Sequence, residues 1–452
     1  GFSMFKSLRR VLVVSLCLVF LISLSVFVNF KALPAQASSK IKLTWMGFGQ
    51  PQEKEIYTKL VKKFMEKYKN ITVDYICTAP GQEYGMKIQA AMASGKLPDV
   101  FYVPPENLRA WVDAGKLLKL TKYVKASKEI NLNNIWPQAI SRYMYDGKMI
   151  GKGDIYALPK DVGPFAFGYN KTMFKKEGIP LPDPKKPYTW NEFVNICKKV
   201  TKDTNGDGKI DQWGTDLDVN WTLHMFVWSN GADWLDSTKT KVTIDDSKFI
   251  EALQFFADLR NKYKVTPTAV QGQSISGYQR WLNGQLAFFP VGPWDVPVYN
   301  KLKFEYDLIP PPVSPRTKKP ATWLGSLGFG VAANTKYPQQ AVDLAAFLST
   351  DREGQRMAYQ LGLQIPNLID MAKNEYVKWK EKPDNKMEFI RIVEDYGRRF
   401  PFEYTYDREW YDTFYSGLQP VLDGKMSAEQ YCKQIKPKIQ KLLDKANQKA
   451  KK

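Results

Sequence analysis

The stretch that sets the fold class is residues 41–75, IKLTWMGFGQPQEKEIYTKLVKKFMEKYKNITVDY. Apolar and polar residues alternate over 41–45 and again over 71–75, which is typical of half-buried strands. Between them, apolar residues recur at helical spacing at Ile56, Leu60, Phe64 and Tyr68. A β-α-β opening of this kind predicts an α/β fold with a mainly parallel sheet and helices on its faces.

The same unit continues further along the chain. A helix is predicted from about Gln82 to Ser94, with Gly95 at its end, and a short apolar strand follows at 100–103. Thr189 and Glu192 can each accept the other's backbone N–H, which predicts the start of another helix. The sheet is therefore expected to grow by repetition of the same β-α unit, although the sequence itself has no internal repeat.

The first 37 residues have the pattern of an export signal. Three basic residues precede an uncharged apolar run from Val11 to Phe30, and the small-x-small sequence Ala35-Gln36-Ala37 follows. A signal core usually has about 7–15 apolar residues, whereas about 18 or more can span a bilayer. The segment 1–37 is therefore either a cleaved signal peptide or a membrane anchor. In both cases the remainder faces outward, because the basic flank stays inside.

The part after the leader, about 415 residues, exceeds the usual length of one core, so two domains are expected. The formal net charge of the chain is +20, but its lysines are spread along the sequence rather than gathered in a stripe. Export and this spread argue against a nucleic-acid partner and for attraction to an anionic cell envelope. The residues before Cys17 do not form a convincing lipoprotein cleavage box.

Few catalytic or metal-binding patterns are present in the sequence. Cys77, Cys197 and Cys432 are odd in number and lack metal-ligand spacing, so we interpret them as mostly buried free thiols. His224 is the only histidine, which excludes a HExxH zinc site, and its apolar surroundings favour a packed side chain. A glycosidase that uses two carboxylates is the enzyme class that survives.

One acidic loop resembles a calcium-binding pattern. In DTNGDGKIDQWG, residues 203–214, oxygen-bearing side chains alternate before a glycine, as a calcium loop requires. The residues assigned to this structural calcium site are Asp203, Asn205, Asp207, Lys209 and Asp211. Gly214 stands where the bidentate glutamate is usual, so the alternative is a turn that joins a helix to a strand. No other cofactor is expected.

Aromatic residues are abundant in the sequence, with 13 Trp and 24 Tyr. Many lie next to glycine, proline or acidic residues rather than on periodic faces; among them are Trp221, Trp228, Trp234, Trp294, Trp323 and Trp410. The C–H face of a sugar ring packs well on an aromatic ring, and such contacts add on the order of 0.5–1.5 kcal/mol beyond burial. Taken as a set, these residues favour a carbohydrate ligand.

A series of short motifs resembles one known family over nearly all of residues 40–452. The motifs, in chain order, are GKLPDV at 95–100, AGKL at 114–117, IYALP at 155–159, YNK at 169–171, TWNEF at 189–193, NGQLA at 283–287, GPW at 292–294 and GFGV at 328–331. In order and spacing they resemble the bacterial extracellular solute-binding proteins that feed ABC importers, in the sugar-binding group that includes maltodextrin-binding protein.

The resemblance implies a periplasmic-binding-protein-like fold with two discontinuous lobes, a hinge of crossing segments, and ligand in the cleft. The implied N-terminal lobe is 38–160 with 328–369, and the implied C-terminal lobe is 163–324 with 372–452. Crossings are expected near 160–163, 324–328 and 369–372. The implied protein is a monomeric, extracellular, cell-surface-associated receptor that binds an oligosaccharide for an ABC transporter permease and performs no chemistry.

The resemblance also implies ligand-binding positions. Trp294 and Trp410 match stacking tryptophans, Glu106 matches a hydroxyl-binding acid, and Phe48 and Gln50 match a loop of polar ligand contacts. Further candidates, by their expected nearness to the cleft, are Asp161, Phe165, Trp221, Trp234, Asp295 and Trp323. Val103 replaces an aromatic residue and Gly163 an acid, so specificity for malto-sugars does not follow. An exported glycosidase and a carbohydrate-binding surface protein without a transporter stay open as alternatives.

Overall fold

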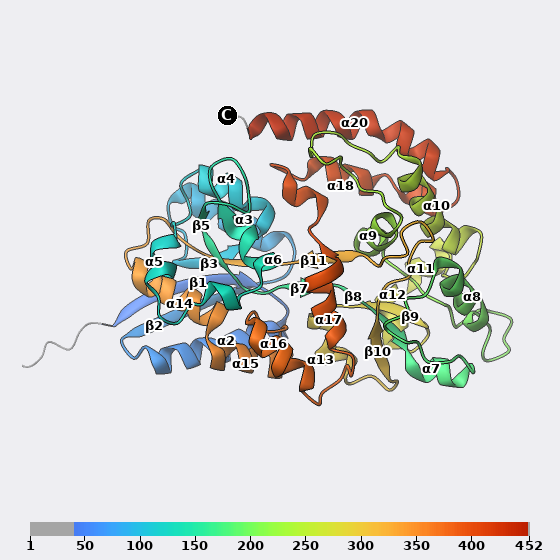
Figure 1. Cartoon of the computed structure of the whole chain (residues 1–452), viewed down its shortest axis with the longest axis horizontal. Helices are drawn as coiled ribbons and strands as arrows, with labels where there is room; N and C mark the ends of the chain where they lie inside the picture. The colour runs from blue at the N-terminus through green and yellow to red at the C-terminus, as the bar shows by residue number, and fades with distance from the viewer. Residues whose placement is uncertain (1–39, 451–452) are drawn as a thin grey trace, which may run out of the picture.

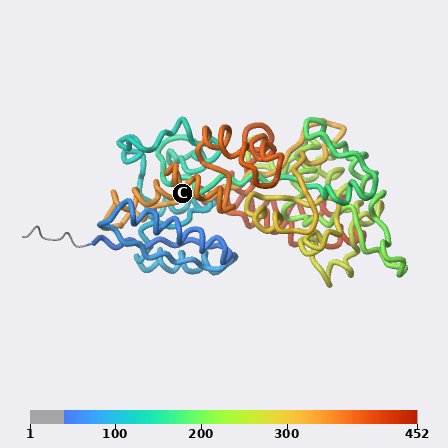
Figure 2. Tube along the Cα trace, turned by 90° about the horizontal axis from the view of Figure 1, so that it is seen from below, coloured from blue at the N-terminus to red at the C-terminus, as the bar shows by residue number. Residues whose placement is uncertain are grey.

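A computed structural model describes residues 40–450 of the chain. The predicted leader and Cys17 lie outside these residues. Within the described range, none of the helices has the length and apolar character needed to cross a bilayer. The chain forms two lobes side by side, joined by the extended segments at the centre of Figure 1. The view from below in Figure 2 shows the same elongated, two-part outline.

The first sheet lies in the N-terminal lobe and has the strand order β2-β1-β3-β12-β6. Its strands are β1 (Ile41–Phe48), β2 (Ile71–Thr78), β3 (Val100–Val103), β6 (Ala157–Pro159) and β12 (Gly328–Val331). β1 pairs in parallel with β2 and β3, as the β-α-β opening predicts, whereas β12 is antiparallel to β3 and β6. The helices of this lobe are α2 (Pro51–Lys67), α3 (Gln82–Ser94), α4 (Leu108–Asp113), α5 (Thr121–Ala126), α6 (Pro137–Ile140), α14 (Pro338–Thr350) and α15 (Arg352–Gln360).

The sheet of the C-terminal lobe differs from the prediction of a mainly parallel arrangement. Its strands β8 (Ala166–Asn170), β9 (Phe288–Val291) and β10 (Tyr306–Ile309) have the order β10-β8-β9, and both pairings are antiparallel. β8 leaves the hinge, whereas β9 ends just before Gly292, beside the cleft. Because one strand runs away from the hinge and its neighbour runs back, the two must pair antiparallel.

Apolar cores lie on both faces of this second sheet, and the remaining described α-helices lie in the C-terminal lobe or at the hinge. They are α7 (Lys171–Lys176), α8 (Trp190–Val200), α9 (Val219–Ser229), α10 (Ser247–Asn261), α11 (Ala269–Ser274), α12 (Gly277–Leu282), α13 (Val296–Tyr299), α16 (Ile369–Asn374), α17 (Met387–Arg391), α18 (Glu409–Ser416), α19 (Gln419–Leu422) and α20 (Ala428–Lys449). Phe167 and Phe288 pack into one apolar core, while Ala166 and Phe289 pack into another on the opposite face. The predicted capping box of Thr189 and Glu192 begins α8, and Gly95 ends α3 with a φ of 70°.

Three extended segments meet at the hinge. β7 (Gly163–Pro164) pairs antiparallel with β11 (Thr322–Gly325), and β11 also pairs with β13 (Gly397–Arg398). The third segment is residues 363–368. The third crossing was expected at 369–372, but those residues form the start of α16 (Ile369–Asn374). The expected crossings at 160–163 and 324–328 therefore lie together, whereas the third lies earlier in the chain. The exact lobe boundaries stay a prediction.

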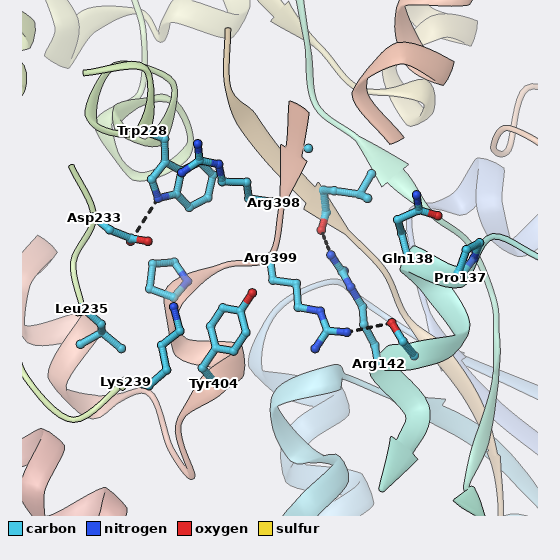
Figure 3. Close-up of a pocket in the computed structure, with 14 residues that line it drawn as sticks. Pro137, Gln138, Arg142, Trp228, Asp233, Leu235, Lys239, Arg398, Arg399 and Tyr404 are labelled. Atoms are coloured by element: carbon cyan, nitrogen blue, oxygen red, sulfur yellow. Dashed lines mark hydrogen bonds between the residues drawn. The ribbon is translucent and has the colours of Figure 1, made fainter. Parts of the chain in front are cut away.

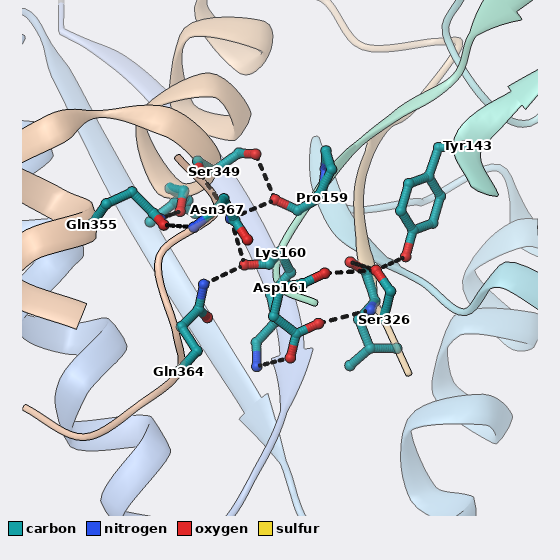
Figure 4. A network of polar contacts seen from close by, with 11 residues as sticks. Tyr143, Pro159, Lys160, Asp161, Ser326, Ser349, Gln355, Gln364 and Asn367 are labelled. Carbon is teal, nitrogen blue, oxygen red and sulfur yellow. Dashed lines mark hydrogen bonds and ion pairs between the residues drawn. The ribbon is translucent and has the colours of Figure 1, made fainter. Parts of the chain in front are cut away.

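Buried hydrogen bonds hold these segments against one another, as Figure 4 shows. The carbonyl of Lys160 accepts from Gln364 Nε2 at 2.7 Å and from Asn367 Nδ2 at 2.9 Å. On the other side, Ser326 Oγ donates to the carbonyl of Asp161 at 2.7 Å, and the N–H of Leu327 donates to Asp161 Oδ1 at 2.9 Å. The first crossing is thus tied by hydrogen bonds to both of the others.

Candidate functional site

Two adjoining cavities form a cleft between the lobes. The larger has a volume of about 820 Å³, and the second, of about 730 Å³, shares its border. Residues common to both cavities are Phe48, Trp221, Gly325, Ser326, Leu327 and Phe400. Phe48 ends β1 in the N-terminal lobe, whereas Trp221 lies on α9 in the C-terminal lobe. The cleft is therefore bounded by both lobes and floored by the hinge.

Three aromatic rings form a parallel stack on one wall of the larger cavity. Phe165 and Trp323 stack with ring centroids 4.4 Å apart, and Trp294 lies 5.9 Å from Trp323 with its plane tilted by 12°. Trp294 follows β9 through a tight turn and is 40% exposed, whereas Trp323 on β11 is 5% exposed. A Cβ at Gly163 would approach the Trp294 ring to 3.1 Å, so glycine there leaves room for the ring. Trp294 lies about equally far from both other rings, 6.1 Å from Phe165, so the three nearly parallel rings form one aromatic surface of which Trp294 is the exposed member.

Carboxylates outnumber cations around this cavity. Its charged lining consists of Glu53, Lys160, Asp161, Asp216, Asp218 and Asp295. Burial raises the pKa of Glu53, and it raises the pKa of Asp295 to about 7 despite a hydrogen bond from the N–H of Gly292. Burial alone would lower the pKa of Lys160, but the charge of Asp161, 3.1 Å away, raises it. The only ammonium of this lining is thus neutralised by its neighbour.

The second cavity has a polar rim from both lobes. Glu106 of the N-terminal lobe lies 3.7 Å from the guanidinium of Arg408 in the C-terminal lobe. Burial raises the pKa of Glu106. The hydroxyl-bearing side chains Tyr411 and Tyr415 line the same space from α18. This half of the cleft therefore combines carboxylates, one arginine and tyrosines around an open volume.

The structure brings most of the predicted site residues to this cleft. Those that line it are Phe48, Glu106, Asp161, Phe165, Trp221, Trp294, Asp295 and Trp323. Their contact with a ligand stays a prediction. The expected placement of Trp234 and Trp410 was wrong, because both side chains are fully buried in the core of the C-terminal lobe. Gln50 precedes α2 and does not line either cavity.

The structure adds cleft residues that the sequence reasoning missed. They include Glu53, Asp216, Tyr278, Phe400, Tyr411 and Tyr415. Tyr411, which lines the second cavity, follows the predicted Trp410 directly in the sequence. Glu53 is three residues beyond the predicted loop contact Gln50, in the first turn of α2. An acidic residue in the first turn of a helix is a recognisable sequence pattern, and it could have drawn attention to Glu53.

His224 is a packed core residue, as its neighbours predict. Its side chain is fully buried, and its Nε2 lies 2.7 Å from the hydroxyl of Tyr411. Burial lowers the pKa of His224 to about 3, so it stays neutral. Cys197 and Cys432 are buried free thiols and Cys77 is a partly buried one, in agreement with the sequence.

The acidic loop 203–214 folds as a series of Asx turns. Asp203 accepts the backbone N–H groups of Gly206 and Gly208, each at 2.7 Å, and Asp211 accepts from Thr204. Within residues 40–450, no three acidic, histidine or cysteine side chains gather as a metal site would require. These contacts fit the turn alternative, and calcium binding stays a prediction that metal analysis checks.

Comparison with known proteins identifies the same kind of fold. A family model described as "Bacterial extracellular solute-binding protein" matches residues 49–355. An ABC substrate-binding protein from Listeria monocytogenes, solved in complex with cycloalternan, superposes with a TM-score of 0.77 at 22% identity. The match covers 90% of this chain and 99% of that chain. The two-lobed, hinged fold expected from the sequence is confirmed.

Two curated relatives are similar over most of their length. The multiple sugar-binding protein of Streptococcus mutans is 23% identical over 342 residues, which is 71% of this chain and 74% of the relative. The galactooligosaccharide-binding protein of Bacillus subtilis is 22% identical over 380 residues, which is 81% of this chain and 83% of the relative.

Proposed function

The chain belongs to the family of bacterial extracellular solute-binding proteins, and from this membership we propose that it captures an oligosaccharide outside the cell for an ABC transporter permease. The names of the two curated relatives and the cycloalternan complex support a sugar ligand. The family and its relatives are binding proteins of importers, and we infer that this chain performs no chemistry on its ligand.

The observation that carries this proposal is the aromatic stack on the wall of the cleft. Trp294, Phe165 and Trp323 all line the larger cavity with nearly parallel rings, and Trp294 is the most exposed of the three. A sugar ring presents C–H groups on its face and hydroxyls at its edge. The indole suits the face, and carboxylates such as Asp161 and Asp295 suit the hydroxyls as hydrogen-bond acceptors.

The charges around the cleft favour an uncharged sugar. Five carboxylates and one lysine line the larger cavity, and that lysine is paired with Asp161. An anionic sugar would therefore find no unpaired cation in this lining, which disfavours its binding relative to an uncharged sugar. The second cavity continues the space toward Glu106 and Arg408, so the cleft has room for a chain of sugar units rather than a single ring.

Delivery to a permease requires a change of state that the ligand drives. The hinge of crossing segments allows the lobes to rotate about it, as in other two-lobed binding proteins. A ligand that contacts both lobes binds the closed state better and shifts the population toward it. We infer that the permease recognises this closed form of a monomeric receptor, and that residues 1–37 direct the chain out of the cytoplasm.

Isothermal titration calorimetry with cello-, manno-, xylo-, malto- and galacto-oligosaccharides tests the proposal. We expect saturable binding of at least one series, with affinity that rises with chain length until the cleft is filled. The sugar is recovered afterwards and analysed by chromatography. Absence of binding across the panel contradicts the proposal, and the appearance of shorter products would show a glycosidase instead.

A further inference from the structure

A third cavity, of about 630 Å³, lies between the lobes behind the hinge. Figure 3 shows its lining. Leu324 lines this cavity, whereas its neighbours on β11, Trp323 and Gly325, line the cleft. Successive side chains of a strand point to opposite faces. The third cavity is therefore on the face of the hinge strand opposite to the cleft, and an occupant there does not compete with a ligand in the cleft.

Cationic side chains from both lobes converge on this cavity. Arg142 comes from the N-terminal lobe, and Lys239, Arg398 and Arg399 come from the C-terminal lobe. Arg399 donates to Ser141 Oγ at 2.9 Å, and Figure 3 shows its guanidinium beside that of Arg142. Among residues 40–450, no carboxylate lies within ion-pair distance of Lys239, Arg398 or Arg399. The lining of this cavity is therefore mainly cationic, whereas carboxylates predominate in the lining of the cleft.

Arg142 supplies a second, independent sign of a missing partner. Its side chain is 1% exposed, and its Nη2 donates to the carbonyl of Leu324. Its Nε has no hydrogen-bond partner, and its Nη1 lies 3.7 Å from Glu403 Oε1 without a hydrogen bond. A buried guanidinium N–H without an acceptor is costly, on the order of 1–3 kcal/mol or more. Arg142 is therefore a buried cation at this cavity whose nearest carboxylate, Glu403, makes no hydrogen bond with it.

The two acidic groups near the cavity leave it with an excess of positive charge. Asp233 accepts from Trp228 Nε1 at 3.1 Å and from the N–H of Trp234 at 2.8 Å, and Glu403 faces Arg142 from the side of the cleft. Four cations thus face two carboxylates. Burial, and after it the charge of Arg142, lower the pKa of Arg399, although the charge of Glu403 opposes this change.

We propose that this cavity behind the hinge is an oxyanion site, in which a phosphate or carboxylate group is held by Arg142 and Arg399 with Lys239 at the rim. Guanidinium groups present their N–H donors in a planar fork that matches the oxygens of such anions. The volume suits a small organic anion as well as an inorganic one. A bound oxyanion would contact both lobes at once and would link them across the hinge.

The test uses the full exported protein and two probes, inorganic phosphate and D-glucuronate, which separate a phosphate from a carboxylate source. Binding is measured by calorimetry and by the shift of the melting temperature, against sodium chloride at equal ionic strength. We expect at least one probe to bind one to one and to raise the melting temperature above the chloride control. The variants Arg399→Gln and Lys239→Gln are each expected to weaken that binding, by roughly tenfold or more for Arg399→Gln, which removes a charge-assisted hydrogen bond.

Arg352→Gln is the matched control, because Arg352 is an exposed arginine paired with Asp370 at 3.0 Å and lies outside the cavity. Its affinity for the probe should equal that of the parent. Lys239→Gln keeps the test decisive if Arg399→Gln folds poorly, since Lys239 is on a loop at the rim. The proposal is overturned if neither probe exceeds the chloride control, or if the variants that fold bind the probe as tightly as Arg352→Gln. Unchanged sugar binding in these variants would separate this site from the cleft.

Discussion

Replacement of Trp294 by alanine tests the aromatic wall of the cleft most directly. Trp294 is 40% exposed, which is about 100 Å² if a free tryptophan presents about 250 Å². A sugar ring that covers half of this area removes about 50 Å² from water, worth about 1.3 kcal/mol at about 25 cal/mol per Å². Ring contact adds about 0.5–1.5 kcal/mol. The sum, about 1.8–2.8 kcal/mol, corresponds to a Kd raised roughly 20- to 100-fold.

Calorimetric titration of the Trp294→Ala variant with the tightest oligosaccharide measures this change. Trp294→Phe should recover part of the loss, because a smaller aromatic ring remains beside Phe165 and Trp323. Trp379→Ala is the control: this partly exposed tryptophan packs on Tyr359 and lines neither cavity of the cleft. The reasoning is refuted if Trp294→Ala, with an unchanged melting temperature, raises Kd less than threefold or no more than Trp379→Ala does.

Three further predictions concern pH, the hinge and calcium. Burial raises the pKa of Asp295 to about 7, so the folded state favours the neutral carboxyl group. The stabilising contribution of this group is full below the ordinary pKa of 3.8 and is lost as pH rises through 7. Asp295→Asn should therefore raise the melting temperature relative to the parent more at pH 8 than at pH 5, and an equal difference at both pH values would contradict this. Asn367→Ala removes an amide whose two N–H groups are shared among three buried backbone carbonyls, so urea unfolding should show a loss of about 2–4 kcal/mol, and a loss below about 1 kcal/mol would argue against the network. If the loop 203–214 holds calcium, metal analysis after dialysis finds one equivalent in the parent and less in Asp207→Ala, whereas a metal-free parent rejects the site.

The sequence was sufficient for elements whose signal is local. The alternation of β1 and β2, the glycine that ends α3 and the capping box of α8 depend on neighbours a few residues away, and all three are present. The antiparallel sheet of the C-terminal lobe has no such signal. Strand direction there follows from where the chain crosses the hinge, which is a property of the whole path rather than of any one strand.

Helix α18 shows why the candidate site was only partly predictable. Trp410 and Phe414 are four residues apart and both are fully buried, whereas Tyr411 and Tyr415, also four apart, line the cleft. Adjacent residues of a helix point about 100° apart, so Trp410 and Tyr411 face different ways. Both rows are largely buried, since Tyr411 is only 4% exposed, and packing of the helix decides which of the two rows reaches the cavity.

The hinge explains how a ligand in the cleft can act on the arrangement of the lobes. Asp161 lines the larger cavity, pairs with Lys160, and accepts the N–H of Leu327 on the second crossing segment. The next carbonyl upstream, that of Lys160, holds the third segment through Gln364 and Asn367. The residues at the floor of the cleft are therefore the same residues that join the crossings. If a sugar hydroxyl donates to Asp161, it shares the carboxylate with Lys160 and with the N–H of Leu327, so binding acts directly on a contact between two crossing segments.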